Sequence, residues 1–249
     1  MEYSICVDSV FDRKVDDQML KELAEINKGI EFWTWWDRNI DVFVHASERY
    51  GIKVKALCTP FISLTDKLKR EEFIEGLSRT IEVCKRLHCK TIISQVGNEL
   101  EISRKEQHDS IVMGLRACRE ILEKNDIILT IEPLNTVVDH KEYYLYNSVE
   151  GFEIIKEAAS PNIKLLYDIY HMQIMEGNIL DHMKENLSLI GHIHIAGVPG
   201  RHEILENELD YQFILKELEK SGYQGTVGLE YFPLKDPMEG IKEFFNKIQ

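Results

Sequence analysis

Short apolar segments alternate with longer amphipathic segments along this chain, and the alternation repeats eight times. The short segments are rich in β-branched and aromatic residues, as strands are, and the longer ones carry apolar residues at helical spacing. Strands are expected at Tyr3–Val7, Gly29–Trp33, Val54–Cys58, Thr91–Val96, Ile127–Glu132, Ile163–Asp168, His192–Ala196 and Thr226–Tyr231. Helices are expected at Asp16–Asn27, Ile40–Tyr50, Glu71–Leu87, His108–Lys124, Val149–Ala159, Ile179–Leu189, Tyr211–Ser221 and Met238–Ile248.

Eight strand-then-helix units in 249 residues predict an α/β fold of the (β/α)8 TIM-barrel class. Such a barrel takes about 250 residues as one domain, and no Pro-, Gly- or Ser-rich linker divides the chain. We therefore expect one domain over residues 1–249, with a doubly wound parallel sheet as the alternative. Because barrel enzymes place their active sites at the C-terminal ends of the strands, polar residues there are the first candidates.

The balance of charge limits the partners of the chain. Lys and Arg number 30 against 43 Asp and Glu, a net charge of −13, and the basic residues are scattered. This argues against nucleic-acid binding, which needs a cationic surface. No apolar run is long enough for a membrane helix, and the first residues lack the pattern of a signal peptide. The five cysteines form no CxxC pair, which favours free thiols in a reducing cytoplasm.

Four consecutive expected strands, the fifth to the eighth, each place one ionisable residue inward near the C-terminal end. These residues are Glu132, Asp168, His194 and Glu230. Three carboxylates this close would repel one another unless a cation compensated them. Three oxygen donors and one imidazole suit Mn²⁺, Mg²⁺, Co²⁺ or Zn²⁺. The pattern therefore predicts one divalent metal ion with positions left for a substrate.

Other polar and aromatic residues lie near the same ends. His171 follows the sixth strand at the entrance of a loop and is a candidate substrate contact, and Arg201 could bind a carboxylate with its planar fork. His192 lies one layer deeper, where a hydrogen-bonded core histidine is the favoured interpretation over a ligand. The role of the three tryptophans after the second strand, whether in the pocket or in packing, stays open: Trp33, Trp35 and Trp36.

The motifs from about Ile127 to Tyr231 resemble the hydroxypyruvate isomerase family, within the xylose-isomerase-like superfamily of metal-dependent TIM barrels. The resemblance rests on residues 131–136 (IEPLNT), 139–140 (DH), 143–145 (YYL), 160–177 (SPNIKLLYDIYHMQIMEG), 191–196 (GHIHIA), 199–203 (PGRHE) and 228–231 (GLEY). It implies metal ligation by Glu132, Asp168, His194 and Glu230, acid–base catalysis by Glu132 and Glu230, and substrate binding by His171 and Arg201.

The sequence departs from that family in two places. Gln is common in hydroxypyruvate isomerases where this chain has His194, whereas the epimerase relatives use His. The segment Phe32–Trp36 and the shorter loop after Cys58 also differ from the family's usual first half. These loops help to form the substrate pocket, so the particular substrate is left open.

The resemblance implies an intramolecular oxidoreductase of the aldose–ketose isomerase type, active on a small keto acid or sugar. Hydroxypyruvate is the first candidate substrate, with tartronate semialdehyde (2-hydroxy-3-oxopropanoate) as its product through an enediolate. A ketose 3-epimerase or a 2-oxo- or 3-oxo-tetronate isomerase is the nearest alternative. An apurinic-site endonuclease and a non-catalytic sugar-binding barrel are further ones. We expect no nucleic-acid or membrane partner and a cytoplasmic location, and association into a homo-oligomer is left open.

Overall fold

Eight parallel strands close into a barrel in the computed structural model, which describes residues 1–248. Each strand pairs with the next in chain order, and the last pairs with the first. The strands are β1 Glu2–Cys6, β2 Gly29–Phe32, β3 Lys53–Cys58, β4 Thr91–Ser94, β5 Ile128–Ile131, β6 Ile163–Asp168, β7 Ile190–Ile195 and β8 Thr226–Leu229. The predicted (β/α)8 barrel is confirmed, and the doubly wound alternative is wrong. The single domain over 1–249 stays a prediction, and its last residue lies outside the described residues.

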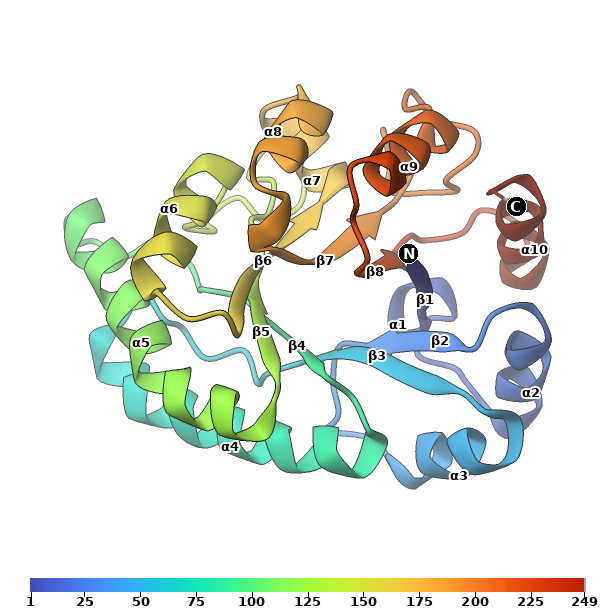
Figure 1. Ribbon diagram of the computed structural model, residues 1–249, viewed down its shortest axis with the longest axis horizontal. Coiled ribbons are helices and arrows are strands. Elements are labelled where there is room, and N and C mark those ends of the chain that lie inside the picture. The colour runs from blue at the N-terminus through green and yellow to red at the C-terminus, as the bar shows by residue number, and fades with distance from the viewer. Residues whose placement is uncertain (249) are drawn as a thin grey trace.

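Helices surround the ring of strands on its outside (Figure 1). The longer ones are α2 Asp17–Ile26, α3 Asp41–Tyr50, α4 Arg70–Leu87, α5 Arg104–Asn125, α6 Ser148–Ala158, α9 Tyr211–Lys220 and α10 Pro237–Ile248. The short ones are α1 Val7–Val10, α7 Ile169–Met175 and α8 Ile179–Glu185, with 3₁₀ turns η1 Lys67–Lys69 and η2 Leu187–Leu189. Within residues 1–248, no helix combines the length and the apolar character needed to cross a bilayer.

Several short features differ from the pattern expected from the sequence. Helices α1 and α7 were not expected, and the helix expected at Ile179–Leu189 is α8 followed by the separate turn η2. Helix α7 begins directly where β6 ends, because the Asp168 side chain accepts hydrogen bonds from the backbone N–H groups of Tyr170 (2.8 Å) and His171 (3.3 Å). A helix capped by the last residue of a strand has no loop before it and therefore gives no turn signal.

The outer faces of the strands and the inner faces of the helices form the main core. A separate small apolar cluster lies inside the barrel, made of Ala56, Cys58, Ile93 and Leu166 with Trp33 packed against it. The five cysteines are buried and unpaired, as their spacing predicted. Buried polar side chains on the strands, among them Ser4, Glu31 and His192, lie in the barrel as well.

Candidate metal and active site

A cavity of about 310 Å³ opens at the C-terminal ends of the strands. Glu132, His194 and Glu230 line its polar part, and His171 on α7 and Arg201 in the segment that follows β7 line it as well. All five were expected at a site from the sequence, so the structure brings the predicted residues to one pocket.

The four predicted ligands converge closely. Glu132 directly follows β5, Asp168 ends β6, His194 lies on β7 and Glu230 directly follows β8. Each residue offers one ligand atom, and these atoms all lie within 4.8 Å of one another. Their alternating neighbours point outward into the core, so the pleat of each strand directs the polar side chain inward.

Opposite charges hold this cluster together. Nδ1 of His194 lies 3.2 Å from Oε2 of Glu230 and 3.6 Å from Oε1 of Glu132. Burial lowers the pKa of His194, but the nearby carboxylates outweigh it and raise that pKa well above its usual value. Burial raises the pKa of Asp168. Burial also opposes ionisation of Glu230, yet Arg201 and His194 hold the pKa of Glu230 well below its usual value.

Several buried atoms of the cluster lack a hydrogen-bond partner within the described chain. They include Oε1 of Glu132, Oδ2 of Asp168 and Nδ1 of His194. Buried polar atoms in proteins are nearly always paired, so unpaired acceptors that face a common point are the pattern a cation would satisfy. Carboxylate oxygens and one imidazole suit Mn²⁺, Mg²⁺, Co²⁺ or Zn²⁺. The residues present therefore fit a divalent ion.

Arg201 contributes a second positive charge to this cluster. Its Nη2 donates to Oε2 of Glu230 and lies 3.7 Å from Oδ2 of Asp168. The guanidinium is flanked by the rings of Tyr170 and Phe232, with its carbon 5.4 and 5.7 Å from their centroids. Sequence reasoning assigned compensation of the three carboxylates to a metal ion alone. The structure corrects this, since Arg201 also compensates them while it lines the cavity.

His171 lies on helix α7, not at a loop entrance as the sequence suggested. Its Nδ1 pairs with the side-chain amide of Asn135 at 2.7 Å, and its Nε2 lies 3.5 Å from Oδ2 of Asp168. Asn135 in turn donates to Asp139 at 2.7 Å. Burial lowers the pKa of His171 well below its usual value. A neutral imidazole held from behind by Asn135 can therefore offer Nε2 to the cavity.

The three tryptophans separate into different roles. The indole N–H of Trp33 donates to Oε1 of Glu230 at 2.6 Å, and its ring lines the cavity. Trp35 donates to the hydroxyl of Thr80 at 3.2 Å and packs in the core. Trp36 is 39% exposed and packs edge-on against Phe61. Among the three, Trp33 has the direct contact with the site.

Sequence reasoning missed two buried acids near the site. Glu31 on β2 is 2% exposed, and its carboxylate contacts both His192 and His194. Asp8 on α1 accepts the backbone N–H of Trp33 at 2.8 Å and pairs with Arg38 at 2.5 Å, which fixes the start of the loop after β2. An acid flanked by apolar residues in a strand, as Glu31 is, was the available signal. Contact with Glu31 also accounts for His192 as a hydrogen-bonded core residue.

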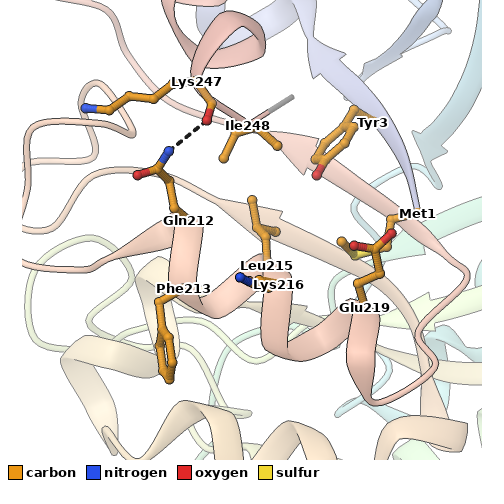
Figure 2. A pocket seen from close by; sticks show the side chains of 9 residues that line it. All are labelled: Met1, Tyr3, Gln212, Phe213, Leu215, Lys216, Glu219, Lys247 and Ile248. Carbon is orange, nitrogen blue, oxygen red and sulfur yellow. Dashed lines mark hydrogen bonds between the residues drawn. The ribbon is translucent and has the colours of Figure 1, made fainter.

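A larger hollow of about 590 Å³ lies elsewhere, between α9, α10 and the start of β1 (Figure 2). The side-chain amide of Gln212 donates to the backbone oxygen of Lys247 within it, at 2.7 Å. Its lining carries one acid, Glu219, and none of the metal-type clusters found in residues 1–248. The smaller cavity at the strand ends is therefore the candidate site.

Comparisons with known proteins agree with the fold. The family described as xylose isomerase-like TIM barrel matches residues 20–248. The Escherichia coli hydroxypyruvate isomerase is 35% identical over 175 residues, which is 70% of this chain and 67% of that protein. A human protein named "Putative hydroxypyruvate isomerase" is 32% identical over 70% of this chain, and the match spans 65% of its length. A 2-oxo-tetronate isomerase of Cupriavidus necator is 39% identical over 46% of this chain and 44% of that protein.

Solved structures show the same fold. A crystal structure from Brucella melitensis, described as AP endonuclease, family 2, has a TM-score of 0.92 at 25% identity and covers 98% of this chain and 97% of its own. The 3-keto-D-glucoside 4-epimerase of E. coli has a TM-score of 0.80 at 18% identity, over 100% of this chain and 98% of its own. The match to the family and to its hydroxypyruvate isomerase members confirms the resemblance seen in the motifs. The chain belongs to the xylose isomerase-like TIM barrel family and is a relative of the hydroxypyruvate isomerases.

Proposed function

We propose that this chain is a metal-dependent isomerase of small hydroxy-keto acids, with the conversion of hydroxypyruvate to 2-hydroxy-3-oxopropanoate as the first candidate reaction. The observation that carries the proposal is that one ligand atom from each of Glu132, Asp168, His194 and Glu230 lies within 4.8 Å of the others, beside a cavity that three of these residues line. The names of relatives at 30–35% identity, hydroxypyruvate isomerases, support the same class of reaction.

In this proposal the four converging residues hold one divalent ion. When bound, the ion supplies positive charge that stabilises negative charge developing on substrate oxygens. Arg201 binds the substrate carboxylate, because a guanidinium matches a carboxylate in geometry and charge. His171, held neutral by burial, donates a hydrogen bond from its Nε2–H group without changing charge, because its Nδ1 accepts from the N–H groups of Asn135.

The reaction requires two proton movements and no net oxidation. A carbon-bound proton leaves C3 of hydroxypyruvate and a proton is added at C2, while the hydroxyl proton on O3 passes to O2. Glu132 and Glu230 are the proposed acid and base, since a carboxylate can take the first proton and a carboxylic acid can return one. Both side chains line the cavity and are almost fully buried, so the two carboxylates can meet a substrate there directly.

A 2-oxo-tetronate isomerase is the second candidate, and a ketose 3-epimerase uses the same kind of site. Two observations favour a longer substrate: the cavity of about 310 Å³ exceeds the volume of a three-carbon acid, and one relative is a 2-oxo-tetronate isomerase. The net charge of −13 disfavours an apurinic-site endonuclease, which must bind polyanionic DNA. All four ligand positions are filled by donors, which disfavours a non-catalytic barrel. The five buried thiols favour a cytoplasmic location.

A substrate panel tests the proposal. Chelator-treated protein is assayed on hydroxypyruvate, 2-oxo- and 3-oxo-tetronates and unphosphorylated ketoses, each with Mn²⁺, Mg²⁺, Co²⁺ or Zn²⁺. The expected result is isomerisation of an acid substrate that depends on added metal. Turnover confined to neutral ketoses would instead assign an epimerase. Turnover that persists in full without metal would contradict the proposed site.

A further inference from the structure

Glu31 contacts His194 on the side of the ring that faces away from the four-residue cluster. Oε1 of Glu31 lies 2.7 Å from Nε2 of His194, whereas Nδ1 of the same ring faces Glu132 and Glu230. A neutral imidazole carries a proton on one nitrogen and a lone pair on the other. A carboxylate beside Nε2 favours the proton there and leaves the lone pair on Nδ1.

Neighbours on two other strands hold the Glu31 carboxylate in place. Its Oε2 accepts a hydrogen bond from the Ser4 hydroxyl on β1 at 2.6 Å and pairs with Nε2 of His192 on β7 at 2.9 Å. Oε1 of Glu31 has no aligned hydrogen-bond partner among the described residues, and neither has Nε2 of His194. The two atoms lie 2.7 Å apart, so each is the other's polar neighbour. Both side chains are buried, and this contact therefore restrains the His194 ring.

Gly228 leaves the space that this contact needs. Glu31 is on β2 and His194 is on β7, and strands β1 and β8 lie between them in the barrel. The Glu31 side chain therefore passes Gly228 on β8 to reach His194. A Cβ atom at position 228 would lie 2.4 Å from Oε1 of Glu31 and 2.7 Å from Cδ2 of His194. Any side chain at this position would therefore displace the carboxylate or the ring.

We propose that Glu31 is a positioning residue that fixes the tautomer and orientation of His194, so that Nδ1 is presented to the metal ion, and that Gly228 makes this possible. The inference rests on the proposed metal site but not on any particular substrate. Carboxylate partners of this kind change metal affinity about 10- to 100-fold when they are removed. The competing interpretation is that Glu31, His192 and His194 themselves bind a second ion. We favour positioning because Ser4 and His192 already contact Glu31 directly.

The test compares Mn²⁺ binding to chelator-treated protein by titration calorimetry. Wild type is expected to bind one ion per chain. Glu31→Gln should bind it about 10- to 100-fold more weakly, because an amide has one acceptor oxygen and cannot serve Ser4 and both histidines. Gly228→Ala should weaken binding in the same direction although Glu31 is intact. Glu150→Gln is the matched control, because Glu150 is a partly buried, hydrogen-bonded acid on α6 outside the site. The affinity of this variant for Mn²⁺ should equal that of wild type.

Nitrogen-15 NMR of the histidine rings supplies a readout that a loss of folding alone would not give. In the Zn²⁺-loaded protein, wild type should show His194 protonated at Nε2 and not at Nδ1, and Glu31→Gln should show a mixture of tautomers. If wild type binds no ion, the proposed metal site is wrong. If wild type binds one ion and both variants keep its affinity and tautomer, the Glu31 inference alone is wrong. Two ions per chain, one of them lost in Glu31→Gln, would make Glu31 a ligand and also overturn it. If Glu31→Gln does not fold, Gly228→Ala decides.

Discussion

At the scale of single residues, the two oxygens of Glu230 have different neighbours. Oε1 accepts the Trp33 indole, while Oε2 faces Arg201 and His194. Changing Glu230 to Gln removes the base but keeps an oxygen that can bind metal weakly, and three other ligands remain. We expect exchange of the substrate α-proton with solvent deuterium to fall by at least about 100-fold, with a smaller loss of metal content. If the variant keeps its metal and still exchanges the proton at the wild-type rate, Glu230 is only a ligand. The base would then be Glu132 or His171.

The Trp33 indole gives a second test of how Glu230 is held. Trp33→Phe keeps an aromatic ring in the cavity but removes the N–H donor. A hydrogen bond to a charged group contributes about 1.5–3 kcal/mol, so we expect kcat to fall about 10- to 100-fold with little change in KM. Trp35→Phe is the control, because it removes an indole hydrogen bond to Thr80 away from the cavity. Equal effects of the two changes on kcat would show that Trp33 acts only through packing.

Arg201 should discriminate between acid and neutral substrates. Arg201→Ala removes a charge-assisted contact to a substrate carboxylate, and it also removes compensation from Glu230 and Asp168. A neutral ketose measured on the same variant reports the second effect alone. We expect kcat/KM to fall more for the best acid substrate than for the ketose. Wild-type kcat/KM on the acid would rule out the carboxylate contact.

Local sequence rules found the four candidate ligands because each lies near or just past the C-terminal end of a strand whose outward neighbours are apolar. They did not find Glu31, although Ile30 and Phe32 flank it in the same way. The importance of Glu31 comes from partners on β1 and β7, which closure of the barrel brings to it. Such contacts depend on packing across the barrel interior, and this packing cannot be predicted from a local sequence pattern.

At the scale of elements, α7 links β6 to the pocket and buries His171 completely. Burial keeps the folded-state pKa of His171 below its unfolded value of about 6.5. The unfolded chain therefore binds the proton more tightly, and the folded state loses stability as pH falls below about 6.5. When the pH is lowered from 7.5 to 5.5, the Tm of wild type should fall. The Tm of His171→Gln should fall by about 2–4 °C less. Exposed His45→Gln on α3 is the control, and an equal pH response of His171→Gln and wild type would contradict the prediction.

Strand ends were harder to predict than strand positions. Strands β4, β5 and β8 end at Ser94, Ile131 and Leu229, before the ends expected from the apolar pattern. Glu132 and Glu230 directly follow two of those ends and enter the site, although the backbone N–H of Glu230 still donates to the carbonyl oxygen of Ile195 on β7 at 3.1 Å. The apolar pattern reports burial, and burial continues past the last ladder hydrogen bond because the loops also pack on the barrel.

At the scale of the whole molecule, metal binding should be coupled to unfolding. Burial raises the pKa of Asp168, so its ionised form destabilises the metal-free folded state as pH rises above the unfolded value. Metal-free Asp168→Asn should therefore melt at the same temperature as wild type or higher. At an Mn²⁺ concentration of about 100 Kd, wild type should gain about 2.7 kcal/mol, or roughly 5–10 °C, and overtake the variant. The measurement is the Tm of both proteins with and without Mn²⁺. If Mn²⁺ raises the Tm of both proteins equally, the ion does not bind at Asp168.

Closure of the barrel was predicted from the count of repeats rather than from any contact. The pairing of β1 with β8 joins residues more than 200 positions apart, such as Tyr3 and Val227. Nothing local to either strand specifies that partner. When eight strands of similar length close into a barrel, every strand is paired on both sides and no edge strand is left.

Asp168 divides its two oxygens between two tasks. Oδ1 caps the first turn of α7, and Oδ2 faces the cluster of candidate ligands. The histidine proposed to touch the substrate is three residues further along the chain, so one carboxylate sets its distance from the ion. A shift of the ion that pulled on Asp168 would carry the start of α7, and His171 with it, in the same direction. Metal and substrate would then move in step, and the alignment between them would survive small motions of the surrounding loops.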